Sequence, residues 1–95
     1  MSADLTLEDF ASHTGTPYRF EGQGYAAQLT LESASTTKSY STRAGGPFVL
    51  YFRGPRGPIL PQGTYAVTGG GRSHDIFIVP VAVEPAGALY ESLFN

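Results

Sequence analysis

Ser73, His74 and Asp75 are the residues that most resemble a catalytic group, because serine, histidine and aspartate form the triad of many hydrolases. A triad works only when the histidine lies between the other two side chains. Neighbouring residues of an extended segment point to opposite faces, so His74 would face away from both partners. We therefore interpret these residues as a polar turn and expect no enzymatic activity.

The two histidines, His13 and His74, are the candidate metal ligands. Glu8 or Asp75 would add a carboxylate, but the spacing matches no metal-binding motif. His13 also falls near the end of a predicted helix, where the helix dipole stabilises a cationic imidazole. The chain has no cysteine, which excludes thiolate ligands and disulfides. We expect no metal site and no cofactor.

Two glycine-rich segments, residues 22–27 and 69–72, resemble nucleotide-binding loops in their letters. The first fits the pattern G-x-G-x-x-A, which requires a following helix and an acidic residue about 20 positions later. A strand pattern follows instead, and residues 42–48 contain no acid. The second lacks the lysine and the helix of a phosphate-binding loop. Both are predicted to be turns, in which glycine accepts positive φ.

The first predicted element of secondary structure is a short N-terminal helix. Thr6 and Asp9 have the spacing of a capping box, and Leu7 and Phe10 share a helical face. The pattern predicts a short helix over residues 7–13, ended by the glycine and proline that follow.

The remainder of the chain is typical of strands and turns. Period-two alternation predicts strands that turn Leu29, Phe48, Phe52 and Tyr65 inward. Residues 33–42 are Ser/Thr-rich and predict a loop with an edge strand. The C-terminal segment also fits a helix, and we interpret it as a strand. The predicted strands are residues 25–33, 48–53, 64–68, 75–83 and 89–94.

The run over residues 75–83 is almost continuously apolar, which is typical of a strand buried on both faces. It places Phe77, Ile78 and Val81 in the core. Pro80 cannot donate to a strand ladder, so a bulge or corner is expected there. The chain is thus predicted to form a single all-β domain over residues 1–95, a mainly antiparallel barrel or sandwich of about six strands with one short N-terminal helix.

The loop over residues 54–63 is the best candidate for a binding site. Its three prolines limit the entropy lost on ordering, and it presents Arg53, at its border, and Arg56, which can bind a carboxylate or phosphate and stack on an aromatic ring. A structural crossover, with Leu60 in the core and Gln62 bonded to backbone, is the alternative. The candidate binding residues are Tyr51, Arg53, Arg56, Ile59 and Gln62.

Composition limits the classes of partner. The net charge is −2, from six cationic and eight acidic residues, so the chain lacks the excess of basic residues that nucleic-acid binding requires. The N-terminus lacks the features of a signal peptide, and no apolar run is long enough to cross a membrane. We therefore expect the protein to be located in the cytoplasm, or in an assembly that is built in the cytoplasm. Only 15% of residues are charged, which favours association with another protein or self-association.

Several segments resemble a family of small bacterial proteins classed as a domain of unknown function. The residues that carry the resemblance are 47–55 (PFVLYFRGP), 60–65 (LPQGTY), 75–81 (DIFIVPV) and 90–95 (YESLFN). The resemblance implies a bacterial setting in which such proteins are often encoded beside phage-tail-collar-like proteins. It implies no activity and no binding residues.

We therefore expect a non-catalytic structural or interaction module, in a phage-tail-like or surface assembly. The alternative is a β-barrel that binds a small ligand such as a carbohydrate on tyrosine and phenylalanine rings, of which the chain has six each.

Overall fold

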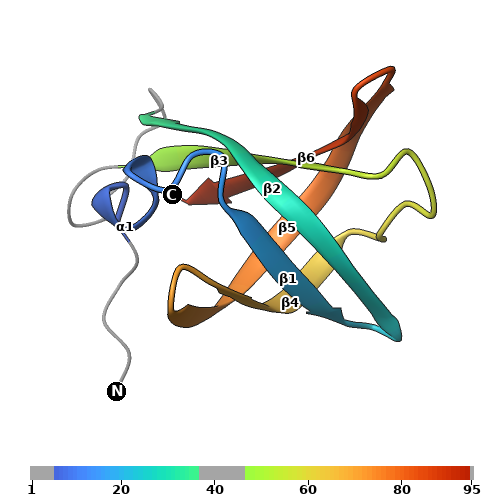
Figure 1. The fold of residues 1–95 in the computed structure, drawn as a ribbon, viewed down its shortest axis with the longest axis horizontal. Coiled ribbons are helices and arrows are strands. Elements are labelled where there is room, and N and C mark those ends of the chain that lie inside the picture. Colours follow the sequence, from blue (N-terminus) through green and yellow to red (C-terminus); the bar gives the residue numbers. More distant parts are fainter. Residues whose placement is uncertain (1–5, 37–46, 95) are drawn as a thin grey trace.

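The computed structural model describes residues 6–36 and 47–94, which form a closed antiparallel barrel with one short helix (Figure 1). The strands close in the order β1-β2-β3-β6-β5-β4, and β4 pairs with β1 to complete the ring. The predicted all-β class is confirmed, and closure selects the barrel over the sandwich. The elements are α1 (Glu8–Ala11), β1 (Pro17–Gly22), β2 (Tyr25–Thr36), β3 (Phe48–Gly54), β4 (Gly63–Gly69), β5 (Arg72–Glu84) and β6 (Gly87–Phe94).

The five predicted strands are present, and each is longer than expected. The C-terminal segment is a strand, as predicted. β2 continues to Thr36, so the predicted loop over residues 33–42 begins as strand, and its remainder lies outside the described residues. β1 had no predicted counterpart, although Tyr18 and Phe20 alternate there with Arg19 and Glu21. The Ser/His/Asp segment lies within β5 and not in a turn.

Helix α1 is shorter than predicted, because only four residues adopt helical structure. The Asp9 carboxylate accepts a hydrogen bond from the Thr6 N–H at 2.9 Å, which is one half of the predicted capping box. In place of the other half, the Asp9 N–H bonds to the backbone carbonyl of Thr6. Arg72 of β5 forms an ion pair with Asp9 at 3.0 Å and so ties the helix to the barrel. The Thr6 N–H, with a smaller contribution from Arg72, holds the pKa of Asp9 below its usual value.

The helix closes one end of the barrel, and the loop between β3 and β4 lies at the other end (Figure 1). Phe10 is fully buried and is the side chain that makes this closure. Its ring centroid lies 5.6 Å from that of His74, 6.3 Å from that of Phe48 and 6.5 Å from that of Tyr18. One helical turn is too short to be stable alone, so this packing is what holds it.

The barrel interior is filled by the inward-facing side chains of all six described strands. Phe52 lies near its centre, with its ring 5.0 Å from that of Phe20 and 5.9 Å from that of Tyr18 in edge-on contacts. The fully buried residues with the largest side chains include Phe20, Leu29, Leu31, Phe48, Leu50, Phe52, Tyr65, Ile76, Ile78 and Tyr90.

Strand β5 departs from its prediction. Ile76 and Ile78 are buried, but Phe77 and Val81 are each 47% exposed, so the prediction of a strand buried on both faces was wrong. A strand of a closed barrel has one face inside and one face outside, so half of an all-apolar strand must point outward. The expected irregularity at Pro80 is confirmed, because the β5–β6 register shifts between Pro80 and Ala82.

Candidate interaction surface

The predicted binding loop, over residues 54–63, spans residues 55–62 between β3 and β4 in the structure and is anchored by buried side chains. Leu60 is buried and packs with the core, and its N–H donates to the phenol oxygen of Tyr90 at 2.9 Å. The Tyr65 hydroxyl donates to the carbonyl of Pro61 at 2.6 Å. Burial raises the pKa of Tyr65, which keeps this donor protonated. The loop is therefore a fixed crossover at its C-terminal half, as the structural alternative predicted for Leu60.

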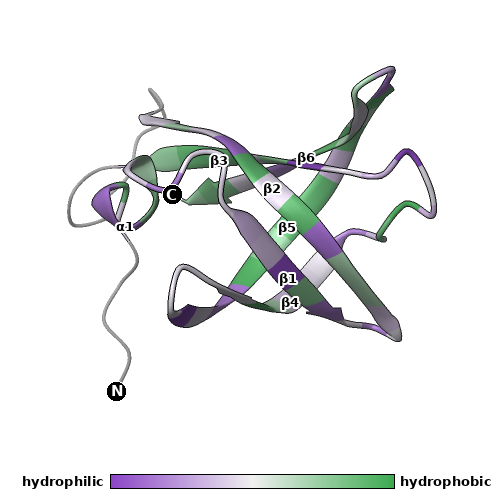
Figure 2. Ribbon diagram, viewed as in Figure 1, coloured by the Kyte–Doolittle hydropathy of each residue, from purple (hydrophilic) through white to green (hydrophobic). Residues whose placement is uncertain are grey.

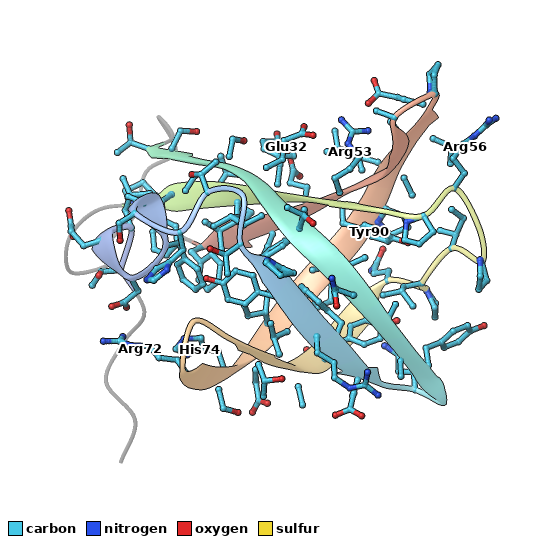
Figure 3. The ribbon with its side chains drawn as sticks, in the orientation of Figure 1. Glu32, Arg53, Arg56, Arg72, His74 and Tyr90 are labelled. Carbon is cyan, nitrogen blue, oxygen red and sulfur yellow. The ribbon has the colours of Figure 1, made fainter. Side chains whose placement is uncertain are left out.

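Arg53 lies at the end of β3, not in the loop, and its guanidinium is occupied. It binds Glu32 of β2 through two hydrogen bonds, at 2.9 and 3.0 Å, and Glu84 of β5 at 2.6 Å. It also donates to the carbonyl of Gly87 at 3.1 Å. Figure 3 shows Glu32 and Arg53 side by side on the outside of the barrel. These bonds lower the pKa of Glu32 and raise that of Arg53. Through them Arg53, on β3, is linked to β2, β5 and β6.

The other predicted residues divide between two places. Tyr51 lies on the outer face of β3, where its hydroxyl donates to Glu91 of β6 at 2.7 Å, and this bond raises the pKa of Tyr51. Arg56, Ile59 and Gln62 lie on the loop: Arg56 is exposed, Ile59 packs partly against the core, and the Gln62 carbonyl is 3.5 Å from the side-chain amide of Gln23. The five predicted residues therefore do not form one site.

The outer faces of β3, β6 and β5 form a surface that the sequence analysis did not identify. Val49 pairs with Leu93, and Tyr51 pairs with Glu91, which pairs in turn with Val79. Phe77 and Leu93 are each nearly half exposed. Hydrophobic colouring is extensive on these three strands (Figure 2). We call this surface the apolar wall; it consists of Val49, Tyr51, Phe77, Val79, Leu89, Glu91 and Leu93.

The opposite side of the barrel has a different chemistry. Arg19 of β1 pairs with Gln28 of β2 and with Thr68 of β4, and all three point outward. An ion pair between Arg19 and Glu21, at 3.2 Å, adds to this surface. β1 is largely hydrophilic in Figure 2. We call this surface the polar wall; it consists of Arg19, Glu21, Gln28, Thr30 and Thr68, with the small side chains of Ala26 and Ala66 beside Glu21.

One signal in the sequence could have revealed the apolar wall. The prediction of a barrel and the prediction of a β5 buried on both faces are incompatible unless a second layer covers the strand. The described residues supply no such layer, because Phe77 remains exposed. An apolar strand in a barrel is thus itself an indication of an outward-facing hydrophobic surface.

The residues considered for catalysis or metal binding are separated. His74 is partly buried against Phe10, whereas Ser73 and Asp75 are exposed on the other face of β5, as the geometric argument predicted. Among the described residues, no three histidine or acidic side chains gather as metal ligands. In that same part of the chain, no helix has the length and hydropathy to span a membrane.

No curated protein and no solved structure matches the chain. A family model does match, over residues 5–94, which include every strand of the barrel. The chain therefore belongs to the family described as Domain of unknown function (DUF6916).

Proposed function

We propose that the protein is a non-catalytic interaction module that binds another protein, or another copy of itself, through the apolar wall. The single observation that carries the proposal is the contrast between the two walls of one barrel. Both walls face outward. The polar wall is lined with threonine, glutamine and an ion pair, whereas the apolar wall is lined with Phe77, Leu93, Val79 and Leu89. Clustered apolar side chains rimmed by polar groups are characteristic of protein-binding surfaces.

The exposure of Phe77 supports this proposal in energetic terms. A strand position facing water gains little from a phenylalanine, whereas covering an aromatic ring in an interface contributes substantially to affinity. Leu93 has the same exposure and lies on the neighbouring strand. Tyr51 contributes an amphipathic ring of the kind enriched at binding hot spots.

The packed interior favours a contact on the outside over a ligand inside. Phe20, Phe52 and Tyr65 are fully buried and meet in the centre of the barrel. A barrel of this size has room for its own side chains or for one small ligand, and here the side chains occupy the space. The setting that we propose, a phage-tail-like or surface assembly, rests on the family resemblance alone.

The proposal is tested by comparing two variants in the cells that naturally produce the protein. Phe77→Ser removes a half-exposed ring from the apolar wall, and Thr68→Ala is the matched change on the polar wall. Affinity-tagged forms are purified together with their partners, and a second copy with a different tag reports self-association. The partner identified in this way is then purified, and its affinity for each form is measured by calorimetry.

We expect the wild-type protein and Thr68→Ala to retain the partner equally, and Phe77→Ser to bind it at least about tenfold more weakly, as for an interface hot spot. Circular dichroism and the melting temperature confirm that both variants are folded. Equal affinity of all three forms would contradict the proposal.

A further inference from the structure

Arg56 differs from the other described arginines. Arg19, Arg53 and Arg72 each form an ion pair with a carboxylate. Arg56 is exposed and has no hydrogen-bond or ion-pair partner in the part of the chain that the structure describes. Figure 3 shows it on the loop, directed away from the barrel. The 55–62 loop contains no acidic residue, so its tip carries one uncompensated positive charge.

The loop presents this charge on a rigid, partly apolar support. Pro55 and Pro58 flank Arg56 and are exposed, and Ile59 follows them. Leu60 is held in the core and bonded to Tyr90. Because Pro55 and Pro58 fix φ beside Arg56 and the anchored Leu60 follows, binding this loop costs less conformational entropy than binding a flexible one.

The apolar wall and its border carry the opposite charge. Glu91 lies in the central strand of the wall, and Glu32 and Glu84 flank Arg53 at its border. Three carboxylates and one guanidinium leave a local charge of −2. Two copies that met wall to wall would bring these carboxylates together, which is unfavourable. The wall therefore selects a positively charged occupant.

Glu91 has one oxygen available for such an occupant. Its Oε2 accepts the hydroxyl of Tyr51 at 2.7 Å, and no described residue donates to its Oε1. The carboxylate is only partly exposed, with Leu89 and Leu93 on either side of it along β6. Covering this carboxylate without a counter-charge is strongly unfavourable, so an occupant that places a cation at Glu91 is favoured. A guanidinium supplies that cation through a charge-assisted hydrogen bond.

We infer that the apolar wall of one copy binds the 55–62 loop of a second copy, with Arg56 on Glu91. This inference rests on the proposed function and names the occupant of the same surface. The loop lies at the end of the barrel and the wall on its side (Figure 1). We take the contact to be one-way, so that each copy keeps one free loop and one free wall after pairing. Such a head-to-tail contact continues into rings or filaments and does not stop at a symmetric dimer.

The test is a charge exchange followed by analytical ultracentrifugation. Arg56→Glu and Glu91→Arg are measured alone and as an equimolar mixture, from about 5 µM to about 1 mM, because small interfaces are weak. Arg19→Glu, on the polar wall, is the matched control for the change of charge. Glu91→Gln is measured as well, because it removes the charge while keeping an oxygen for the Tyr51 bond.

We expect the mass of the wild-type protein and of Arg19→Glu to rise with concentration beyond that of a dimer. Arg56→Glu and Glu91→Arg should each remain monomeric, Glu91→Gln should associate at least about tenfold more weakly, and the mixture should recover assembly. A monomeric wild-type protein at the highest concentration, or an Arg56→Glu variant that assembles like the wild type, would overturn the inference. The proposed function survives that result if Phe77→Ser still loses a different partner, and both fail if it does not.

Discussion

Phe52 and Phe77 are both phenylalanines in the middle of apolar strands, yet the barrel gives them opposite environments. Phe52 is fully buried in edge-on contact with Phe20 and Tyr18. Phe77 is 47% exposed on the apolar wall, opposite Thr64 of β4. Replacing each with alanine therefore separates the contribution of the core from that of the outer surface.

The expected costs follow from burial. Phe52→Ala leaves a cavity among aromatic rings, and such changes destabilise a core by about 3–5 kcal/mol. Burying a whole phenylalanine side chain contributes about 1.5–3 kcal/mol. Because Phe77 is half buried, Phe77→Ala should lower the free energy of unfolding by about 1 kcal/mol. The lower strand propensity of alanine raises this loss to at most about 2 kcal/mol. A domain of this size has a stability of about 5–14 kcal/mol, so Phe52→Ala could unfold it. Phe52→Leu is therefore included as a milder substitution that preserves folding.

The assay is equilibrium unfolding in urea, followed by far-UV circular dichroism and by tyrosine fluorescence, since the chain has no tryptophan. We expect the order of free energies of unfolding to be wild type, Phe77→Ala, Phe52→Leu and Phe52→Ala, from highest to lowest. A Phe77→Ala variant as unstable as Phe52→Ala would refute the assignment of Phe77 to the outside of the barrel.

Three further predictions concern the ends of the barrel. Tyr90→Phe leaves the buried N–H of Leu60 without its acceptor and should lower the free energy of unfolding by about 1–3 kcal/mol, with faster hydrogen exchange at that amide. Gly87→Ala should destabilise the fold, because Gly87 has a φ of 130° and an added methyl group would meet a backbone carbonyl of β3; thermal melting measures the loss. The pKa of Asp9 is lower in the folded state, so its contribution is complete above the usual carboxyl pKa of 3.8 and is lost as pH falls through the folded-state value. Asp9→Asn, which weakens the bond to Thr6, should therefore be about 0.5–1 kcal/mol less stable than wild type at pH 7 and equally stable near pH 2; a constant difference at both pH values would contradict this account.

Period-two alternation was sufficient to predict the fold class, and it also identified the inward face of each strand that has only one apolar face. Tyr65 and Val67 alternate with small or polar residues and face inward as predicted. β5 lacks that contrast, because Ile76 and Phe77 are equally apolar, and only closure of the ring determines which face is inside. The register of six strands is a property of the whole chain, so no local pattern could supply it.

The candidate site was predictable only in part, for a related reason. Loop composition correctly indicated that Arg56 is exposed. Arg53 was expected to be available as well, but Glu32 and Glu84, 21 and 31 positions away in the sequence, reach its guanidinium through strand pairing. Leu93 entered no prediction of a site, because its place beside Val49 depends on the pairing of β3 with β6.

The central claim, that the apolar wall is covered when the protein acts, is tested most directly by thiol labelling in the cells that produce the protein. The chain has no cysteine, so Leu93→Cys and Thr68→Cys each introduce a single reporter, one on the apolar wall and one on the polar wall. We expect a membrane-permeable maleimide to label Thr68→Cys rapidly both in cells and in dilute purified protein. It should label Leu93→Cys rapidly only in the dilute purified protein. Equal labelling of the two cysteines in cells would mean that the apolar wall stays open to water, and would contradict the account.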